Sequence, residues 1–423
     1  MKIIQKKLST GLRLLMAPQP DAATVTVLVL VGAGSKYETK KESGLSHFLE
    51  HMYFKGTTVR PTARVISEEL DNIGAISNAF TGHEYTGYYA KGSPKHAEKF
   101  VDVLSDIYLN STFPEKEIEK EKGVIVEEIN MYEDLPQHKV FDQLMATMFG
   151  DQPVGWAISG TKEQVKSFSR KDFIKYQLEH YTAGNTVISV AGAFDPKAIE
   201  GTVKKAFAAI SKATAKSKKK VNDKQVAPLH VQFSKNIDQT HIAIAFRSAP
   251  INHPDGPALS LLGTILGGGM SSRLFLQLRE ELGAAYYVRA DHDPFTDHGL
   301  FVITAGIDKS RFEEIISAMI ATLKNIKAEL VSKEELNKVK EYTLGMMRLG
   351  LESSDSIAGF YGTQLLLKGE YKTPEQLTKE YMTVTAADIM RVAKKLFVAK
   401  NSTLSVVGPI ENTIPYEELF AQL

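Results

Sequence analysis

An internal repeat limits the folds that this 423-residue chain can adopt. Three segments of the first half recur in the second half at spacings of 214 to 218 residues. The matched pairs are residues 45–46 and 259–260, residues 113–118 and 331–336, and residues 185–192 and 401–408. Several matches at nearly one spacing indicate a duplicated domain of about 210 residues. We therefore expect two similar halves rather than one large core.

The expected domains follow from the repeat and from a change in composition between its copies. A chain of 423 residues is too long for one ordinary hydrophobic core. We expect a first domain over residues 1–211 and a homologous second domain over residues 228–423. Residues 212–227 are rich in lysine and poor in apolar side chains, which is typical of a solvated linker. A polybasic site for a partner is the alternative interpretation of this segment.

Strand-like and helix-like segments alternate in both halves without a strict βαβ rhythm. The expected strands are residues 25–31, 85–91, 186–191, 241–246, 286–290, 300–305 and 403–407. The expected helices are residues 94–109, 114–133, 171–180, 311–326 and 333–351. Pairs of strands followed by pairs of helices predict an α+β fold, with helices packed on a mainly antiparallel sheet in each half.

Residues 47–51 read His-Phe-Leu-Glu-His and indicate a metal site. On a helix, His47 and His51 lie one turn apart on the same face, so both rings can reach one ion. Glu50 projects beside them, where its carboxylate can polarise a metal-bound water. The order H-x-x-E-H is the inverse of the commoner H-E-x-x-H zinc-peptidase motif. The alternative is an amphipathic helix with solvated histidines and a core stripe of Leu45, Phe48, Leu49 and Met52.

A catalytic zinc site needs a third protein ligand, and an acidic helix can provide it. The helix expected over residues 114–133 carries Glu121 and Glu128, which lie two turns apart on one face. Glu127 points about 100° away from Glu128 and is the weaker candidate. The spacing alone does not choose between these carboxylates.

Residues 44–57 (GLSHFLEHMYFKGT) resemble the signature of the M16 metallopeptidases, which include pitrilysin, insulin-degrading enzyme and the mitochondrial processing peptidase. The resemblance continues through residues 78–81, 153–155, 160–161 and 181–185, and covers essentially the whole chain. It implies one zinc ion per chain, held by His47, His51 and Glu128. It also implies that Glu50 is the general base, that Glu121 orients a ligating histidine, and that the two domains face each other across a cleft.

The second half lacks this metal chemistry but resembles the family in another motif. At the repeat spacing, the three expected ligands correspond to Leu261, Ile265 and Met346. Residues 279–286 (REELGAAY) resemble the family's Arg/Tyr pair. This resemblance implies that Arg279 positions a substrate carbonyl and that Tyr286 stabilises the developing oxyanion. The neighbouring Tyr287 is not expected to be the tyrosine of this pair, because adjacent residues of a strand point to opposite sides.

Two further segments complete the candidate sites. The resemblance implies that Asn78, Ala79 and Phe80 belong to an edge strand that binds an extended peptide through main-chain hydrogen bonds. Residues 291–298 contain two histidines and three aspartates, but Pro294 and the flanking strand patterns favour a hairpin loop over a metal cluster.

Taken together, these features predict a zinc-dependent endopeptidase that hydrolyses unstructured peptides. Because one chain carries both the zinc motif and the Arg/Tyr pair, we expect a self-sufficient enzyme that forms a homodimer. Two alternatives stay open at this point. The first is that the chain is a non-catalytic core subunit of a larger complex. The second is that it is a catalytic subunit that needs a different partner chain.

Composition and charge indicate which partners and which cellular compartment to expect. A formal net charge of +1 gives no reason to expect nucleic acid or an anionic membrane as a partner. The absence of cysteine suits a reducing compartment. The first residues lack the apolar core of a signal peptide, and the apolar run 25–31 is too short to cross a bilayer. We therefore expect a cytoplasmic protein.

Overall fold

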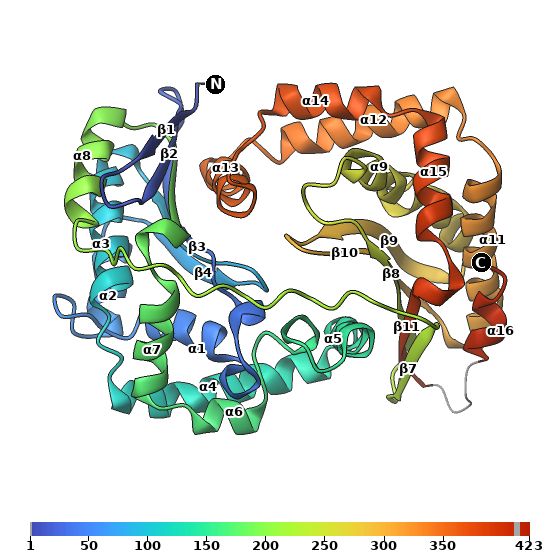
Figure 1. Ribbon diagram of the computed structural model, residues 1–423, viewed down its shortest axis with the longest axis horizontal. Helices are drawn as coiled ribbons and strands as arrows, with labels where there is room; N and C mark the ends of the chain where they lie inside the picture. Colours follow the sequence, from blue (N-terminus) through green and yellow to red (C-terminus); the bar gives the residue numbers. More distant parts are fainter. Residues whose placement is uncertain (1, 410–414) are drawn as a thin grey trace. The chain divides into compact units, whose positions relative to one another are not determined.

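The chain forms an α+β fold with two β-sheets, each packed against helices (Figure 1). The computed structural model describes residues 2–409 and 415–423. It contains two compact units. One comprises Met1–Asn130, Trp156–Lys219 and Arg348–Lys372, and the other comprises Met131–Gly155, Lys220–Met347 and Thr373–Leu423. The α+β class predicted from the sequence is confirmed.

The first unit is built on a six-stranded sheet. In spatial order its strands are β1 (Ile4–Lys7), β2 (Arg13–Pro18), β6 (Thr186–Gly192), β3 (Val25–Val31), β5 (Thr86–Gly92) and β4 (Ile76–Thr81). All neighbouring pairs are antiparallel except β2 and β6. All seven residues of β3 are buried, which explains its continuous apolar sequence, because helices cover both faces of the sheet here.

The second unit repeats this order with five strands. They are β7 (Leu229–Ser234), β11 (Ser402–Gly408), β8 (Gln239–Ser248), β10 (Gly299–Asp308) and β9 (Ala285–Pro294). Again one neighbouring pair, β11 and β7, is parallel and the others are antiparallel. Along the chain, β7, β8, β9, β10 and β11 take the places of β2, β3, β4, β5 and β6, so the topology supports the duplication.

The helices also follow the repeat. Those of the first half are α1 (Leu45–Met52), α2 (Ala63–Asp71), α3 (Ala97–Asn110), α4 (Glu115–Asp134), α5 (Pro136–Phe149), α6 (Lys162–Ser167), α7 (Arg170–His180) and α8 (Pro196–Ala206). Those of the second half are α9 (Gly256–Gly267), α10 (Arg273–Phe275), α11 (Phe312–Ala328), α12 (Lys333–Leu349), α13 (Ser354–Lys368), α14 (Pro374–Thr383), α15 (Ala386–Leu396) and α16 (Tyr416–Phe420). A π-helical turn, Leu276–Glu281, continues α10.

The two halves of the sequence exchange one helix each. Helix α13, from the second half, packs against β3 and β6 of the first unit (Figure 1). The Ser354 hydroxyl lies 2.8 Å from that of Thr26, and the Ser189 hydroxyl donates to the carbonyl of Ala358 at 2.8 Å. Helix α5, from the first half, packs against β11 and β8 of the second unit in the same way. The exchange completes the second apolar face of each sheet.

The exchange also determines where the chain passes between the units. The chain passes from the first unit to the second between Lys219 and Lys220, inside the linker expected over residues 212–227. The expected boundaries did not include the exchanged segments, Met131–Gly155 and Arg348–Lys372. Sequence periodicity shows that a helix has an apolar face, but it does not show which sheet that face will cover. No helix in the described part of the chain is both long and apolar enough to span a bilayer.

Candidate metal centre

Helix α1 presents the H-x-x-E-H motif, and the residues before the helix fix its start. Gly44 has φ +93°, and a Cβ there would lie 2.6 Å from the carbonyl oxygen of Ser159, so only glycine fits. The two side-chain oxygens of the buried Glu38 accept hydrogen bonds from the backbone N–H groups of Gly44 at 2.9 Å and Ser46 at 2.7 Å. These contacts satisfy donors that a helix N-terminus otherwise leaves without partners.

The predicted core stripe of α1 is confirmed, and it directs the motif away from the core. The four apolar residues of the stripe are at most 1% exposed: Leu45, Phe48, Leu49 and Met52. His47, Glu50 and His51 are partly exposed on the remaining side of the helix. The amphipathic pattern and the metal motif therefore occupy different faces of one helix, and neither interpretation excludes the other.

The structure brings His47, His51 and Glu128 together. Their ligand atoms lie within 4.8 Å of one another. The Nε2 atom of His47 is 3.6 Å from one Glu128 carboxylate oxygen, and the Nε2 atom of His51 is 3.5 Å from the other. Among the residues that the structure describes, this is the only group of at least three histidine, aspartate or glutamate side chains placed to share an ion.

This donor set fits a metal ion with tetrahedral coordination. Ligand atoms about 2.0–2.1 Å from a tetrahedral zinc lie roughly 3.3 Å from one another, close to the two imidazole–carboxylate separations. Two imidazoles and one carboxylate also leave a fourth position open, which is typical of catalytic rather than structural zinc sites. Glu127, in contrast, is exposed and accepts a hydrogen bond from Asn130, so it lies outside the group.

Glu121 fixes the orientation of His51. Its Oε1 atom lies 2.9 Å from Nδ1 of His51, and its Oε2 atom accepts a hydrogen bond from Nζ of Lys55 at 2.6 Å. Burial opposes ionisation of Glu121, but the hydrogen bonds from His51 and Lys55 outweigh burial and lower its pKa. An ionised Glu121 holds the proton of His51 on Nδ1 and leaves Nε2 free for a metal. The sequence motif did not point to Lys55, because no spacing rule links it to Glu121.

Glu50 contacts a residue that we did not assign from the sequence. The Thr81 hydroxyl donates a hydrogen bond to Glu50 Oε2 at 2.5 Å. Thr81 is the last residue of β4, which is an edge strand of the first sheet, as the resemblance implied. Asn78 and Phe80 are exposed on this strand and Ala79 is half-buried. The last residue of β4 is thus next to the helix that carries Glu50.

The Arg/Tyr pair is formed within the second unit. Arg279, on the π-helical turn, donates to the backbone carbonyl of Tyr286, and its guanidinium carbon lies 5.7 Å from the centre of the Tyr286 ring. Tyr286 is 68% exposed on the edge strand β9. Tyr287 faces the other side, where its hydroxyl lies 3.0 Å from Nδ1 of His241. The prediction that Tyr287 points away is confirmed.

Within residues 2–409 and 415–423, two other features of the second unit do not form a metal site. Residues 291–293 continue β9 and pair with β10, so the expected hairpin loop was too long and the connection is only residues 295–298.

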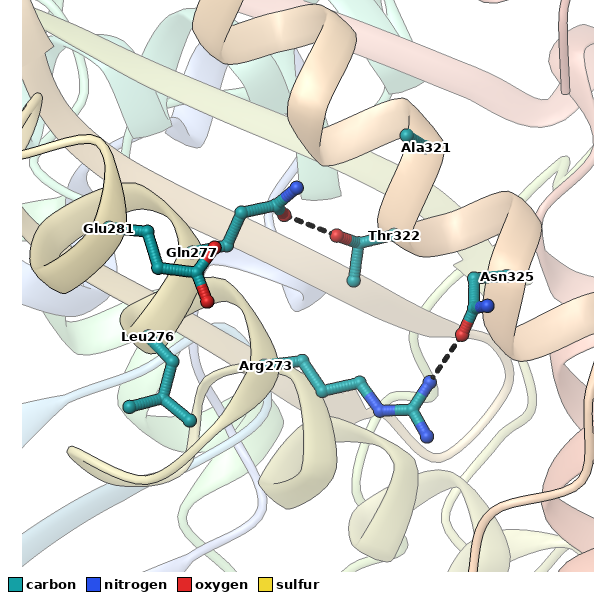
Figure 2. A pocket seen from close by; sticks show the side chains of 7 residues that line it. All are labelled: Arg273, Leu276, Gln277, Glu281, Ala321, Thr322 and Asn325. Carbon is teal, nitrogen blue, oxygen red and sulfur yellow. Dashed lines mark hydrogen bonds between the residues drawn. The ribbon is translucent and has the colours of Figure 1, made fainter.

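A pocket of about 550 Å³ lies beside α11 (Figure 2). Four of its polar side chains bond in pairs, with Arg273 donating to Asn325 at 2.9 Å and Thr322 to Gln277.

Replacement of Glu38 tests how α1 is held in place. Glu38→Ala leaves the buried N–H groups of Gly44 and Ser46 without an acceptor, at about 1–3 kcal/mol for each group. We expect the free energy of unfolding, measured by urea denaturation, to fall by about 3 kcal/mol. Glu68→Ala, which removes an exposed carboxylate from α2, is the control and should change stability by less than about 0.5 kcal/mol. A loss below about 1 kcal/mol in Glu38→Ala would contradict the anchoring role.

Comparison with known proteins shows the family to which the chain belongs. Residues 13–162 match the family model described as Insulinase (Peptidase family M16), and residues 167–342 match the model described as Peptidase M16 inactive domain. An uncharacterized zinc protease of Bacillus subtilis, YmxG, is 36% identical over 95% of this chain and 97% of its own length. The chain therefore belongs to the M16 peptidase family, in its short two-domain form.

A further sequence match and two solved structures are also similar to this chain. The probable mitochondrial-processing peptidase subunit beta of Arabidopsis thaliana is 32% identical over 97% of this chain and 79% of its own length. The crystal structure of a protease from Helicobacter pylori superposes with a TM-score of 0.89 at 23% identity, covering 96% of this chain and 99% of that one. The M16 inactive domain structure from Pseudomonas fluorescens also gives 0.89, at 18% identity, over 98% and 100% of the two chains.

Proposed function

We propose that this chain is a zinc-dependent endopeptidase that hydrolyses unstructured peptides. One observation carries the proposal. The carboxylate of Glu50 is presented by the same helix as two imidazoles, which lie within reach of Glu128 and form a donor set suited to zinc. The names of the relatives support the choice of zinc, since the Bacillus subtilis protein is called a zinc protease.

Three residues would hold the metal ion, and a fourth, Glu50, acts as the general base. A zinc ion held by His47, His51 and Glu128 would supply Lewis-acid chemistry, lowering the pKa of a water molecule and polarising a peptide carbonyl. Glu50 takes the proton of the attacking water on Oε1, since Oε2 already accepts the Thr81 hydroxyl. Among the described residues, no side chain or backbone group donates a hydrogen bond to Oε1, so this oxygen is available for the transfer.

Substrate binding is assigned to β4 and to the Arg/Tyr pair. An extended peptide adds to the free edge of β4 through main-chain hydrogen bonds beside Asn78, Ala79 and Phe80, which selects for unfolded chains more than for side chains. Arg279 offers fixed donors to a substrate carbonyl, and the exposed Tyr286 hydroxyl stabilises the oxyanion. Because one chain carries all these groups, we propose that it acts without a different partner, as a homodimer.

The test is cleavage of a mixed set of unstructured peptides by the purified chain alone. We expect cleavage that stops with a zinc chelator and returns when zinc is added back. The molar mass of the active fraction, measured by light scattering, should be that of two chains. Bound zinc without cleavage would point to a catalytic subunit that needs a different partner, and neither zinc nor cleavage would favour the non-catalytic core subunit.

A further inference from the structure

Thr81 holds the carboxylate of Glu50 from a separate element of the fold. The hydroxyl can only donate in this contact, because an ionised carboxylate has no proton to give. The 2.5 Å separation between Thr81 Oγ1 and Glu50 Oε2 is typical of a charge-assisted O–H···O⁻ hydrogen bond. Thr81 lies in β4 and Glu50 in α1, thirty-one positions apart, so the contact depends on the tertiary fold.

The surroundings of Thr81 keep its hydroxyl in place. Thr81 pairs with Thr86 across the β4–β5 hairpin, and the Thr86 hydroxyl donates to the carbonyl of Ala33 at 2.9 Å. The next residue, Gly82, donates its N–H to the Tyr85 carbonyl at 2.8 Å and closes the turn. A β-branched side chain also has few χ1 rotamers. The Thr81 hydroxyl therefore projects from a strand end that these hydrogen bonds hold in place.

The alternation of β4 explains why Thr81 rather than its neighbour meets α1. Successive side chains of a strand point to opposite faces. Phe80 turns to the other side, where its ring lies over Gly87, at which a Cβ would be 2.3 Å from the tip of the ring. Ala79 and Thr81 are the less exposed residues of the strand, and Ala79 packs against the core that includes α1.

We propose that Thr81 is a positioning residue for the general base. By occupying Oε2, its hydroxyl fixes the glutamate side chain in the rotamer that leaves Oε1 for the attacking water. Because Thr81 ends the strand to which the substrate adds, one element aligns both the peptide and the base. This inference rests on the proposed peptidase function, and it assigns Thr81 no direct contact with the substrate or the metal.

The test compares Thr81→Val, which keeps the side-chain shape, with Thr81→Ser, which keeps the hydroxyl. We expect Thr81→Val to lower kcat about 10- to 100-fold, since small misplacement of a catalytic group costs up to about 100-fold. KM should change by less than about twofold, because the interaction acts in the chemical step. Thr81→Ser should recover most of the kcat of the parent chain, because it keeps the hydroxyl that bonds to Glu50. Zinc content and Tm should stay the same in both variants.

A matched control and a double mutant separate positioning from structural damage. Thr202→Val removes another threonine hydroxyl that donates to a glutamate, Glu98, at 2.9 Å on the exposed side of α8, and kcat should not change. In a Glu50→Gln background, Thr81→Val should not lower the residual rate further, because the two residues act as one unit. The affinity of that background for an uncleaved peptide should also be unaffected by Thr81→Val.

Several outcomes would overturn the inference. An unchanged kcat in Thr81→Val, a rise in KM alone, or an additive loss in the double mutant would each exclude positioning of Glu50. In all three cases, chelator-sensitive cleavage by the parent chain would leave the peptidase function intact. A parent chain that binds no zinc and cleaves no peptide would overturn the proposed function, and this inference with it.

Discussion

Glu50→Gln is expected to lower peptide cleavage by about 100- to 10,000-fold, the range attributed to general base catalysis. Glutamine has the shape of glutamate but does not accept a proton at neutral pH, so the water molecule keeps its proton. The amide can still bond to Thr81, which preserves the local geometry. The rate should be measured as kcat on the peptide cut best by the parent chain, with zinc content determined on the same sample.

Zinc content makes this experiment decisive. Glu50 is not a member of the donor group, so Glu50→Gln should bind as much zinc as the parent chain. Loss of activity at full zinc content would identify Glu50 as a group of the chemical step. Full activity in Glu50→Gln would show that another residue takes the proton. Loss of zinc and activity together would instead place Glu50 among the residues that support the metal.

The structure shows which parts of this centre the sequence could predict. The His47–His51 spacing and the core stripe of α1 are local, since both follow from 3.6 residues per turn. The helix expected over residues 114–133 is observed as Glu115–Asp134, because its acidic first turn and its period are also local signals. Glu128 was chosen over its neighbours by resemblance to a family, and the structure places it against both histidines.

Contacts between distant elements were not predictable in this way. Thr81 and Lys55 contact Glu50 and Glu121 only because β4, α1 and α4 meet in space. The exchange of α5 and α13 has the same cause, since each helix covers a sheet built mainly from the other half of the sequence. Strand β9 continues through His292 because that residue pairs with Phe301 of β10, a partner that local turn signals do not reveal.

Glu128→Gln is expected to remove both zinc and activity. The substitution replaces the only anionic donor of the group with a neutral amide and leaves two imidazoles, one fewer than the three protein ligands of a catalytic zinc site. Loss of a residue that merely orients a ligand costs about 10- to 100-fold in metal affinity, so loss of a ligand should cost more than about 100-fold. Zinc should be undetectable after gel filtration, and cleavage should fall to the level of the chelated parent chain.

Glu127→Gln is the matched control, because it makes the same chemical change one position earlier on α4. Glu127 is exposed, and among the described residues its hydrogen bond is a local one, from Asn130, so zinc content and kcat should equal those of the parent chain. Both variants change helix propensity and net charge equally. A difference between them therefore reports which of the two carboxylates on α4 points to the metal site. If Glu127→Gln lost zinc and Glu128→Gln kept it, the assigned ligand would be wrong. If both kept it, the two histidines would bind zinc with a donor other than either carboxylate.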